Sequence, residues 1–258
     1  MKVNLLEFVE TKFLVWIALI SRLTGFFLVA PFFSGAMFPV EVKVSLLVFL
    51  SWLLTVSSDT TIPLNSPIFL LVVNSILNFL VGFGIGYLPQ LVLQAFGGAG
   101  YIVGFQMGLG IEEVFALSDE EGTNPMGEIV YFLALSVFVI LKGPLLIYEG
   151  LVDSLKVFPA DLLNLKTSFL EHIVHSSGDF FVMVLKIGLP MMAFMLVVSV
   201  VLGILSRLVP QMNVFMVGLP MKVLVGLIFF MGMIPIWAEV AGEISGRALN
   251  AISSLIGE

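Results

Sequence analysis

Long apolar runs, separated by short polar stretches, divide this chain into six segments. They lie at roughly 13–33, 42–56, 68–96, 128–148, 180–206 and 208–236. Backbone amide and carbonyl groups in hydrocarbon must find hydrogen-bond partners within their own segment, as they do in an α-helix. The pattern therefore predicts an all-α, membrane-associated protein.

Two stretches fit a simple bundle of membrane spans poorly. As a helix, segment 42–56 would be about 22 Å long, short of a hydrocarbon core of about 30 Å. Residues 60–111 carry no charge and are too many for one ordinary span, and Pro89 and Gly97-Gly98 interrupt them where a helix kinks or stops. We therefore expect broken helices rather than a standard bundle of spans.

Several basic residues fall inside the apolar segments. They are Arg22, Lys142, Lys186 and Lys222. A charge near the centre of a bilayer costs about 3 kcal/mol on insertion scales and should face protein or water. We therefore expect partner subunits to lie alongside these helices.

Composition supports the membrane assignment and narrows the function. Of 258 residues, 59% are hydrophobic and 11% charged, and the mean hydropathy of +1.14 excludes an ordinary soluble domain. The net charge of −7, without a cluster of basic residues, argues against nucleic acid as a partner. The chain has no cysteine, and His172 and His175 lack further metal ligands nearby. We expect no metal, no cofactor and no catalytic site.

Gly100, Gly104 and Gly108 recur at every fourth position. On a helix this spacing forms one smooth face that another backbone can approach closely. A hinge or unwound segment is the alternative, because each glycine inside a helix costs about 1 kcal/mol relative to alanine.

Asn74 and Asn78, four residues apart in an apolar segment, suggest hydrogen bonds between helices or the polar lining of a pore. A second polar feature is an acidic stretch that follows the uncharged one. It contains Glu112, Glu113, Asp119, Glu120 and Glu121 and ends at Gly122-Thr123-Asn124-Pro125. This composition predicts a loop, either a solvated connector or a functional loop at the mouth of a pore.

The most specific motif lies at residues 207–222 and reads RxxPQxNxFxxGxPxK. It resembles the signature of the FliR/SctT family, which supplies one subunit of the bacterial type III protein-export gate. Further matches extend the resemblance over nearly the whole chain: Arg22, Gly25, Pro31, Phe33, Pro39, Lys43, Ala99, Gly100, Gln106, Met107, Gly108, Pro190 and Gly203.

The apolar residues of the stretch 237–258 recur at helical spacing and predict a C-terminal amphipathic helix. The resemblance implies that residues 1–258 form one helical, non-enzymatic gate subunit, built of bent helical hairpins with an unconventional membrane topology. Such a subunit packs with FliP-like and FliQ-like subunits, beside FlhB-like and FlhA-like export components and membrane lipid. Its place would be the bacterial inner membrane at the flagellar basal body, where unfolded protein subunits cross during flagellar assembly.

The resemblance also implies a plug loop at about 109–125. Because burying unpaired carboxylates is costly, we expect its apolar residues to fill the channel: Ile111, Val114, Phe115 and Leu117. Gly100, Gly104 and Gly108 would pack helices. The residues expected to contact other subunits are Arg22, Arg207, Pro210, Gln211, Asn213, Gly218, Pro220 and Lys222.

Other functions remain open from the sequence. An injectisome homologue would share the motif, while a small-molecule secondary transporter would also have broken helices and charges within the membrane. Such transporters usually have paired repeats, and no clear repeat is visible here. A membrane-embedded hydrolase would need a nucleophile and a base on facing helices.

Overall fold

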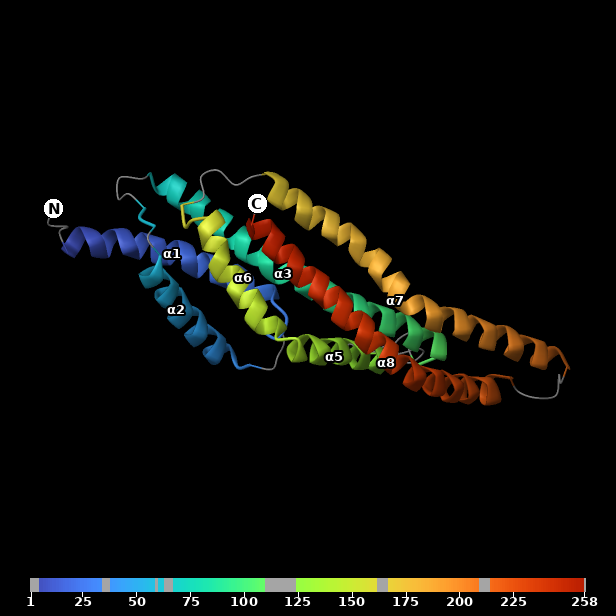
Figure 1. Ribbon diagram of the computed structural model, residues 1–258. Coiled ribbons are helices and arrows are strands. Elements are labelled where there is room, and N and C mark those ends of the chain that lie inside the picture. The colour runs from blue at the N-terminus through green and yellow to red at the C-terminus, as the bar shows by residue number, and fades with distance from the viewer. Residues whose placement is uncertain are drawn as a thin grey trace. The chain divides into compact units, whose positions relative to one another are not determined.

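The computed structural model describes residues 5–33, 38–58, 60–62, 67–109, 124–161, 167–208 and 214–257. All of the regular structure within these ranges is α-helical, so the prediction of an all-α protein is confirmed (Figure 1). The helices are α1 (Leu5–Val29), α2 (Val40–Ser57), α3 (Ile68–Met107), α5 (Pro125–Ile140), α6 (Gly143–Val157), α7 (Thr167–Leu208) and α8 (Val214–Gly257).

Five helices of the described part are long and apolar enough to cross a membrane. Their apolar windows are Lys12–Val29, Val40–Ser57, Ile68–Met107, Ser177–Leu208 and Met216–Gly246. The 40 residues of α3 extend about 60 Å, twice the usual hydrocarbon thickness. The stretch 237–258, expected as an amphipathic helix, continues α8 as far as Gly257.

The expectation that the helix stops at Pro89 or at Gly97-Gly98 is wrong, because α3 continues through all three residues. A proline removes one backbone donor and one intrahelical hydrogen bond, which a long apolar helix can tolerate. Each glycine approaches a neighbour closely. A Cβ on Gly98 would lie 3.3 Å from Val184 of α7, so packing compensates for low helix propensity.

The expected apolar segment 128–148 divides into α5 and α6. Lys142, between them, has the left-handed backbone conformation φ 58°, ψ 26°, and its side chain is exposed. Pro144 follows in the first turn of α6, a position that needs no backbone donor. The charge of Lys142 therefore lies at a helix break rather than inside a helix.

The chain divides into two compact units, each built from separated parts of the sequence. One contains Met1–Leu91, Lys142–Ser177 and Gly246–Glu258, and the other contains Val92–Leu141 and Gly178–Ser245. The long helices α3, α7 and α8 contribute to both.

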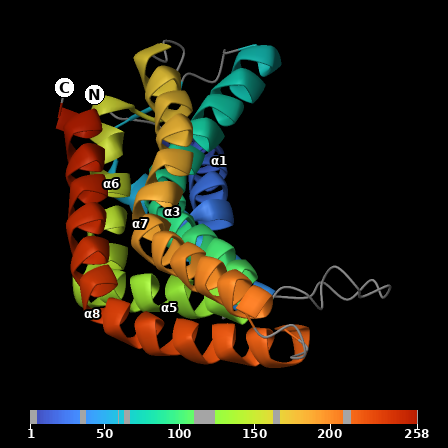
Figure 2. The same ribbon diagram turned by 90° about the vertical axis from the view of Figure 1, so that its right-hand side faces the viewer.

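In the first unit, α1 packs against α2 and against the N-terminal half of α3 (Figures 1 and 2). Trp16 Nε1 donates to Ser51 Oγ at 3.0 Å, which ties α1 to α2. Glycines bring α1 and α3 into backbone contact, since a Cβ on Gly82 would lie 1.8 Å from the carbonyl oxygen of Arg22.

In the second unit, α7 and α8 pack through aromatic and apolar residues. The rings of Phe194 and Phe229 stack with centroids 3.9 Å apart. Trp237 is buried, and its Nε1 donates to the carbonyl oxygen of Ile187 at 3.1 Å. Each contact joins one helix to the other, so the pair forms a common core.

Candidate functional site

The first candidate region is the C-terminus of α3, where the expected plug loop begins. Gly108 has φ 92°, in the region of backbone space that favours glycine. Leu109 N donates to Gly104 O at 3.0 Å, and Gly108 N donates to Phe105 O at 3.1 Å. These two bonds form a Schellman motif, which ends the helix while satisfying its last carbonyls.

Asn124 lies at the other end of the expected loop and caps the N-terminus of α5. Its Oδ1 accepts a hydrogen bond from Met126 N at 3.1 Å. Its Nδ2 donates to the carbonyl oxygen of Tyr101, on α3, at 3.1 Å. The side chain is buried, and it therefore joins the start of α5 to the last turns of α3.

Gly100 and Gly104 form a notch on α3 for the start of α5. A Cβ on Gly104 would lie 2.2 Å from Asn124 Oδ1, and one on Gly100 would lie 2.5 Å from Met126 O. Gly108, expected on the same helix face, instead follows the helix as its C-terminal cap. The close contact between α3 and α5 therefore depends on the first two glycines.

The four expected gate residues, Ile111, Val114, Phe115 and Leu117, lie outside the described residues, as does the whole range 110–123. The described residues on either side fix the ends of this range. Leu109 and Asn124 both bond to α3 within the turn from Tyr101 to Gly104. The expected plug loop therefore starts and finishes at one place on α3.

A second polar cluster lies in the first unit, around Arg22. Its Nε donates to Asn78 Oδ1 at 3.0 Å and its Nη1 to Ser154 Oγ at 3.2 Å. Its Nη2 donates to the carbonyl oxygen of Phe158 at 2.8 Å. Arg22 is only 1% exposed. The structure thus places it inside its own chain, whereas the sequence suggested a contact between subunits.

Asn74 and Asn78 complete this cluster. Their Nδ2 atoms donate to the carbonyl oxygen of Ala160 at 2.8 and 3.0 Å. Both side chains are buried, so they do not line an open pore in this structure. Arg22 and the two amides together donate to the backbone carbonyls that follow α6. The spacing of Asn74 and Asn78 along their helix did not predict this role.

The motif at 207–222 lies at the end of α7 and the start of α8. Arg207 and Pro220 are exposed, Lys222 is half-buried and Gly218 is buried. Pro210, Gln211 and Asn213 lie outside the described residues. Large apolar side chains nearby are exposed as well, among them Leu208 at 71% and Met216 at 77%. Such surfaces are typical of contacts with lipid or with partner subunits.

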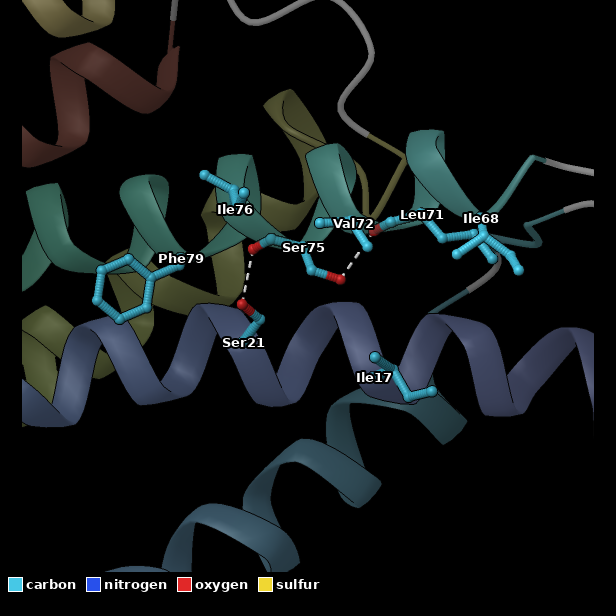
Figure 3. Close-up of a pocket in the computed structure, with 8 residues that line it drawn as sticks. All are labelled: Ile17, Ser21, Ile68, Leu71, Val72, Ser75, Ile76 and Phe79. Atoms are coloured by element: carbon cyan, nitrogen blue, oxygen red, sulfur yellow. Dashed lines mark hydrogen bonds between the residues drawn. The ribbon is translucent and has the colours of Figure 1, made fainter.

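An open groove of about 450 Å³ lies between α1 and the N-terminal half of α3 (Figure 3). It is lined by Ile17, Ser21, Ile68, Leu71, Val72, Ser75, Ile76 and Phe79. Ser21 Oγ donates to Ser75 O at 2.6 Å, and Ser75 Oγ donates to Leu71 O at 2.9 Å. Because both hydroxyl protons go to backbone carbonyls, the groove offers mainly apolar contact.

The long apolar helices with buried polar clusters define an all-α membrane protein. The chain belongs to the bacterial export proteins, family 1, whose sequence pattern matches residues 13–248. It is 30% identical over 217 residues to the flagellar biosynthetic protein FliR of Buchnera aphidicola subsp. Acyrthosiphon pisum, covering 83% of each chain. The FliR of Aquifex aeolicus is 30% identical over 239 residues, 91% of this chain and 89% of the relative. The FliR of Escherichia coli is 24% identical over 261 residues, 98% of each. The resemblance found in the sequence is therefore confirmed.

Proposed function

We propose that this chain is a structural gate subunit of the flagellar type III protein-export apparatus, in the bacterial cytoplasmic membrane at the flagellar basal body. Family membership over residues 13–248 carries this proposal. The relatives reported above are named as flagellar proteins, which favours the flagellum over the injectisome. In this role the subunit helps to line and close the export channel. Other components supply the energy for export, and the chain is not an enzyme.

The partners proposed for this subunit are FliP-like and FliQ-like proteins, with FlhB-like and FlhA-like components beside them. The exposed apolar ends of α7 and α8 support such contacts, since a partner would cover Leu208 and Met216. Arg207, Pro210, Gln211, Asn213, Gly218, Pro220 and Lys222 are the proposed contact residues. Arg22 is not among them, because its hydrogen bonds are made within the chain.

The proposed gate is the segment 109–125. Its apolar residues, Ile111, Val114, Phe115 and Leu117, would fill the channel, while its carboxylates would face water at the mouth. A few apolar side chains can seal against neighbouring subunits and still yield to a passing unfolded chain. The attachment of Leu109 and Asn124 to the same part of α3 supports this role, because it places the residues that flank the segment 110–123 near each other.

Deleting the gene in its source bacterium tests the function. We expect the cells to lose flagellar filaments and secreted filament protein, and a plasmid copy of the gene to restore both. Loss of injectisome secretion with intact filaments would contradict the proposal. So would purification of the native protein as a monomer that binds a metabolite.

Deleting Val114 to Glu121 tests the gate. The shortened subunit should assemble with its partners, but the complex should conduct small ions in a planar bilayer. The unmodified complex provides the control. If the deletion complex seals as tightly as this control, the loop is a solvated connector and not a gate.

A further inference from the structure

One lysine of α7 lies on an exposed, apolar face of the helix. Lys186 is exposed and falls within the apolar window Ser177–Leu208. Large apolar side chains around it are exposed as well: Val182 at 47%, Leu185 at 51% and Leu189 at 60%. At 1.5 Å per residue, Lys186 lies about 14 Å from the start of the window. A charge at such a position is costly in hydrocarbon and requires a partner.

The other basic residues within the apolar segments have different surroundings. Arg22 is buried and donates to groups of its own chain. Lys142 lies at the break between α5 and α6, and Lys222 is half-buried. Within the part of the chain that the structure describes, no group accepts a hydrogen bond from Lys186 or pairs with its charge. The partner of Lys186 must therefore come from another molecule.

The same turn of α7 also provides a backbone acceptor. Pro190 follows Lys186 by four residues inside the helix, and it has no N–H to donate to the carbonyl oxygen of Lys186. Pro190 is exposed too, and residues four apart lie on one face of a helix. An otherwise apolar surface therefore offers two polar groups close together, the charged donor Nζ and the carbonyl oxygen of Lys186.

The opposite face of α7 is used within the chain's own core. Val184, Ile187 and Met191 are buried. Val184 lies 3.3 Å from the position that a Cβ on Gly98 of α3 would take, and Trp237 of α8 donates to Ile187 O at 3.1 Å. Another molecule can therefore reach this part of α7 on the outer face, where Lys186 lies.

We propose that the outer face of α7 around Lys186 binds a membrane helix of a neighbouring subunit that carries one carboxylate and a nearby hydroxyl on an otherwise apolar surface. The carboxylate accepts from Lys186 Nζ, and the hydroxyl donates to Lys186 O. A phospholipid phosphate also carries negative charge, but it has only acceptor oxygens and leaves the carbonyl without a donor. Polar pairs within apolar helix contacts fix the register of the two helices. This inference rests on the multi-subunit complex proposed above and adds Lys186 to its contact residues.

Cross-linking of the complete complex, purified from membranes with its partner subunits, tests this contact. A membrane-soluble carbodiimide activates a carboxylate, the lysine amine displaces the activating group as a urea, and an amide joins the two side chains without a spacer. We expect a cross-linked peptide between Lys186 and an aspartate or glutamate of another subunit. Lys156 and Asp153, 2.7 Å apart in this chain, provide the internal control. If the control pair cross-links and Lys186 does not, the inference is wrong.

Substitutions at Lys186 measure what the contact contributes to assembly. Lys186→Met keeps an apolar side chain but leaves the partner's carboxylate unpaired, so we expect about tenfold less partner subunit to co-purify. Lys186→Arg keeps the charge without a primary amine, and it should retain the partner but lose the cross-link. Leu189→Met changes the same face at nearly constant volume and serves as the matched control. Equal recovery of partner with Lys186→Met and with this control would overturn the inference.

Two other outcomes separate this contact from a lipid site and from the proposed function. Native mass spectrometry of the complex detects bound anionic phospholipid. If Lys186→Met loses such a lipid and keeps every partner subunit, Lys186 binds lipid and the inference is overturned while the proposed function stands. Purification of the unmodified chain as a monomer from its native membrane would refute the proposed function and this inference together.

Discussion

The cluster around Arg22 and the contact at Asn124 both fix α3 to another part of the chain, but they differ in how many groups take part. Three side chains, those of Arg22, Asn74 and Asn78, donate to the carbonyls of residues 158–160. Arg22 also donates to Asn78 Oδ1 and Ser154 Oγ. At the other site one asparagine makes two hydrogen bonds. Removing Arg22 takes the donor from three acceptors, whereas removing Asn124 leaves two polar groups without this partner.

This difference predicts effects of different size on stability. An unsatisfied buried polar group costs about 1 to 3 kcal/mol, so the loss of Arg22 is comparable with much of the stability of a domain. The loss of Asn124 corresponds to one N-cap and one further bond. The first site should determine whether the chain folds, and the second should determine how firmly the start of α5 is held to α3.

Arg22→Met should have the largest effect. It removes the donors for Asn78 Oδ1, Ser154 Oγ and Phe158 O, and we expect a loss of about 4 kcal/mol from these unsatisfied groups. Yield and melting temperature of the assembled complex measure it. Arg22→Lys should restore little, since an ammonium lacks the planar fork of the guanidinium. A normal melting temperature for Arg22→Met would show that the cluster is not essential.

Gly82→Ala should have the second-largest effect, because its Cβ would lie 1.8 Å from the backbone oxygen of Arg22. Backbone cannot move aside as a flexible side chain can, so we expect a loss of about 3 kcal/mol through overpacking. Gly203→Ala has open space and should gain up to about 1 kcal/mol from helix propensity. Thermal unfolding of the two complexes compares them. Equal melting temperatures would contradict the close approach of α1 and α3.

Local patterns in the sequence predicted much of this structure. The apolar runs predicted helices, and the glycine spacing predicted the face on which Gly100 and Gly104 lie. The role of Arg22 could not be predicted, because its partners at Ser154 and Phe158 are more than 130 positions away and two of the acceptors are backbone carbonyls. The expected end of the helix at Pro89 was wrong for a related reason. Local propensity does not include the tertiary packing that keeps α3 continuous.

Asn124→Ala should have the smallest effect on stability, and it tests the comparison most sharply. It removes an N-cap acceptor and one donor, for which we expect a loss of about 1 kcal/mol. The complex should therefore keep nearly its full yield while its melting temperature falls by a few degrees. Measured beside Arg22→Met in the same detergent, the variant should lose much less stability. A loss as large as that of Arg22→Met would show that the contact at Gly104 holds the second unit together, and the distinction between the two sites would then fail.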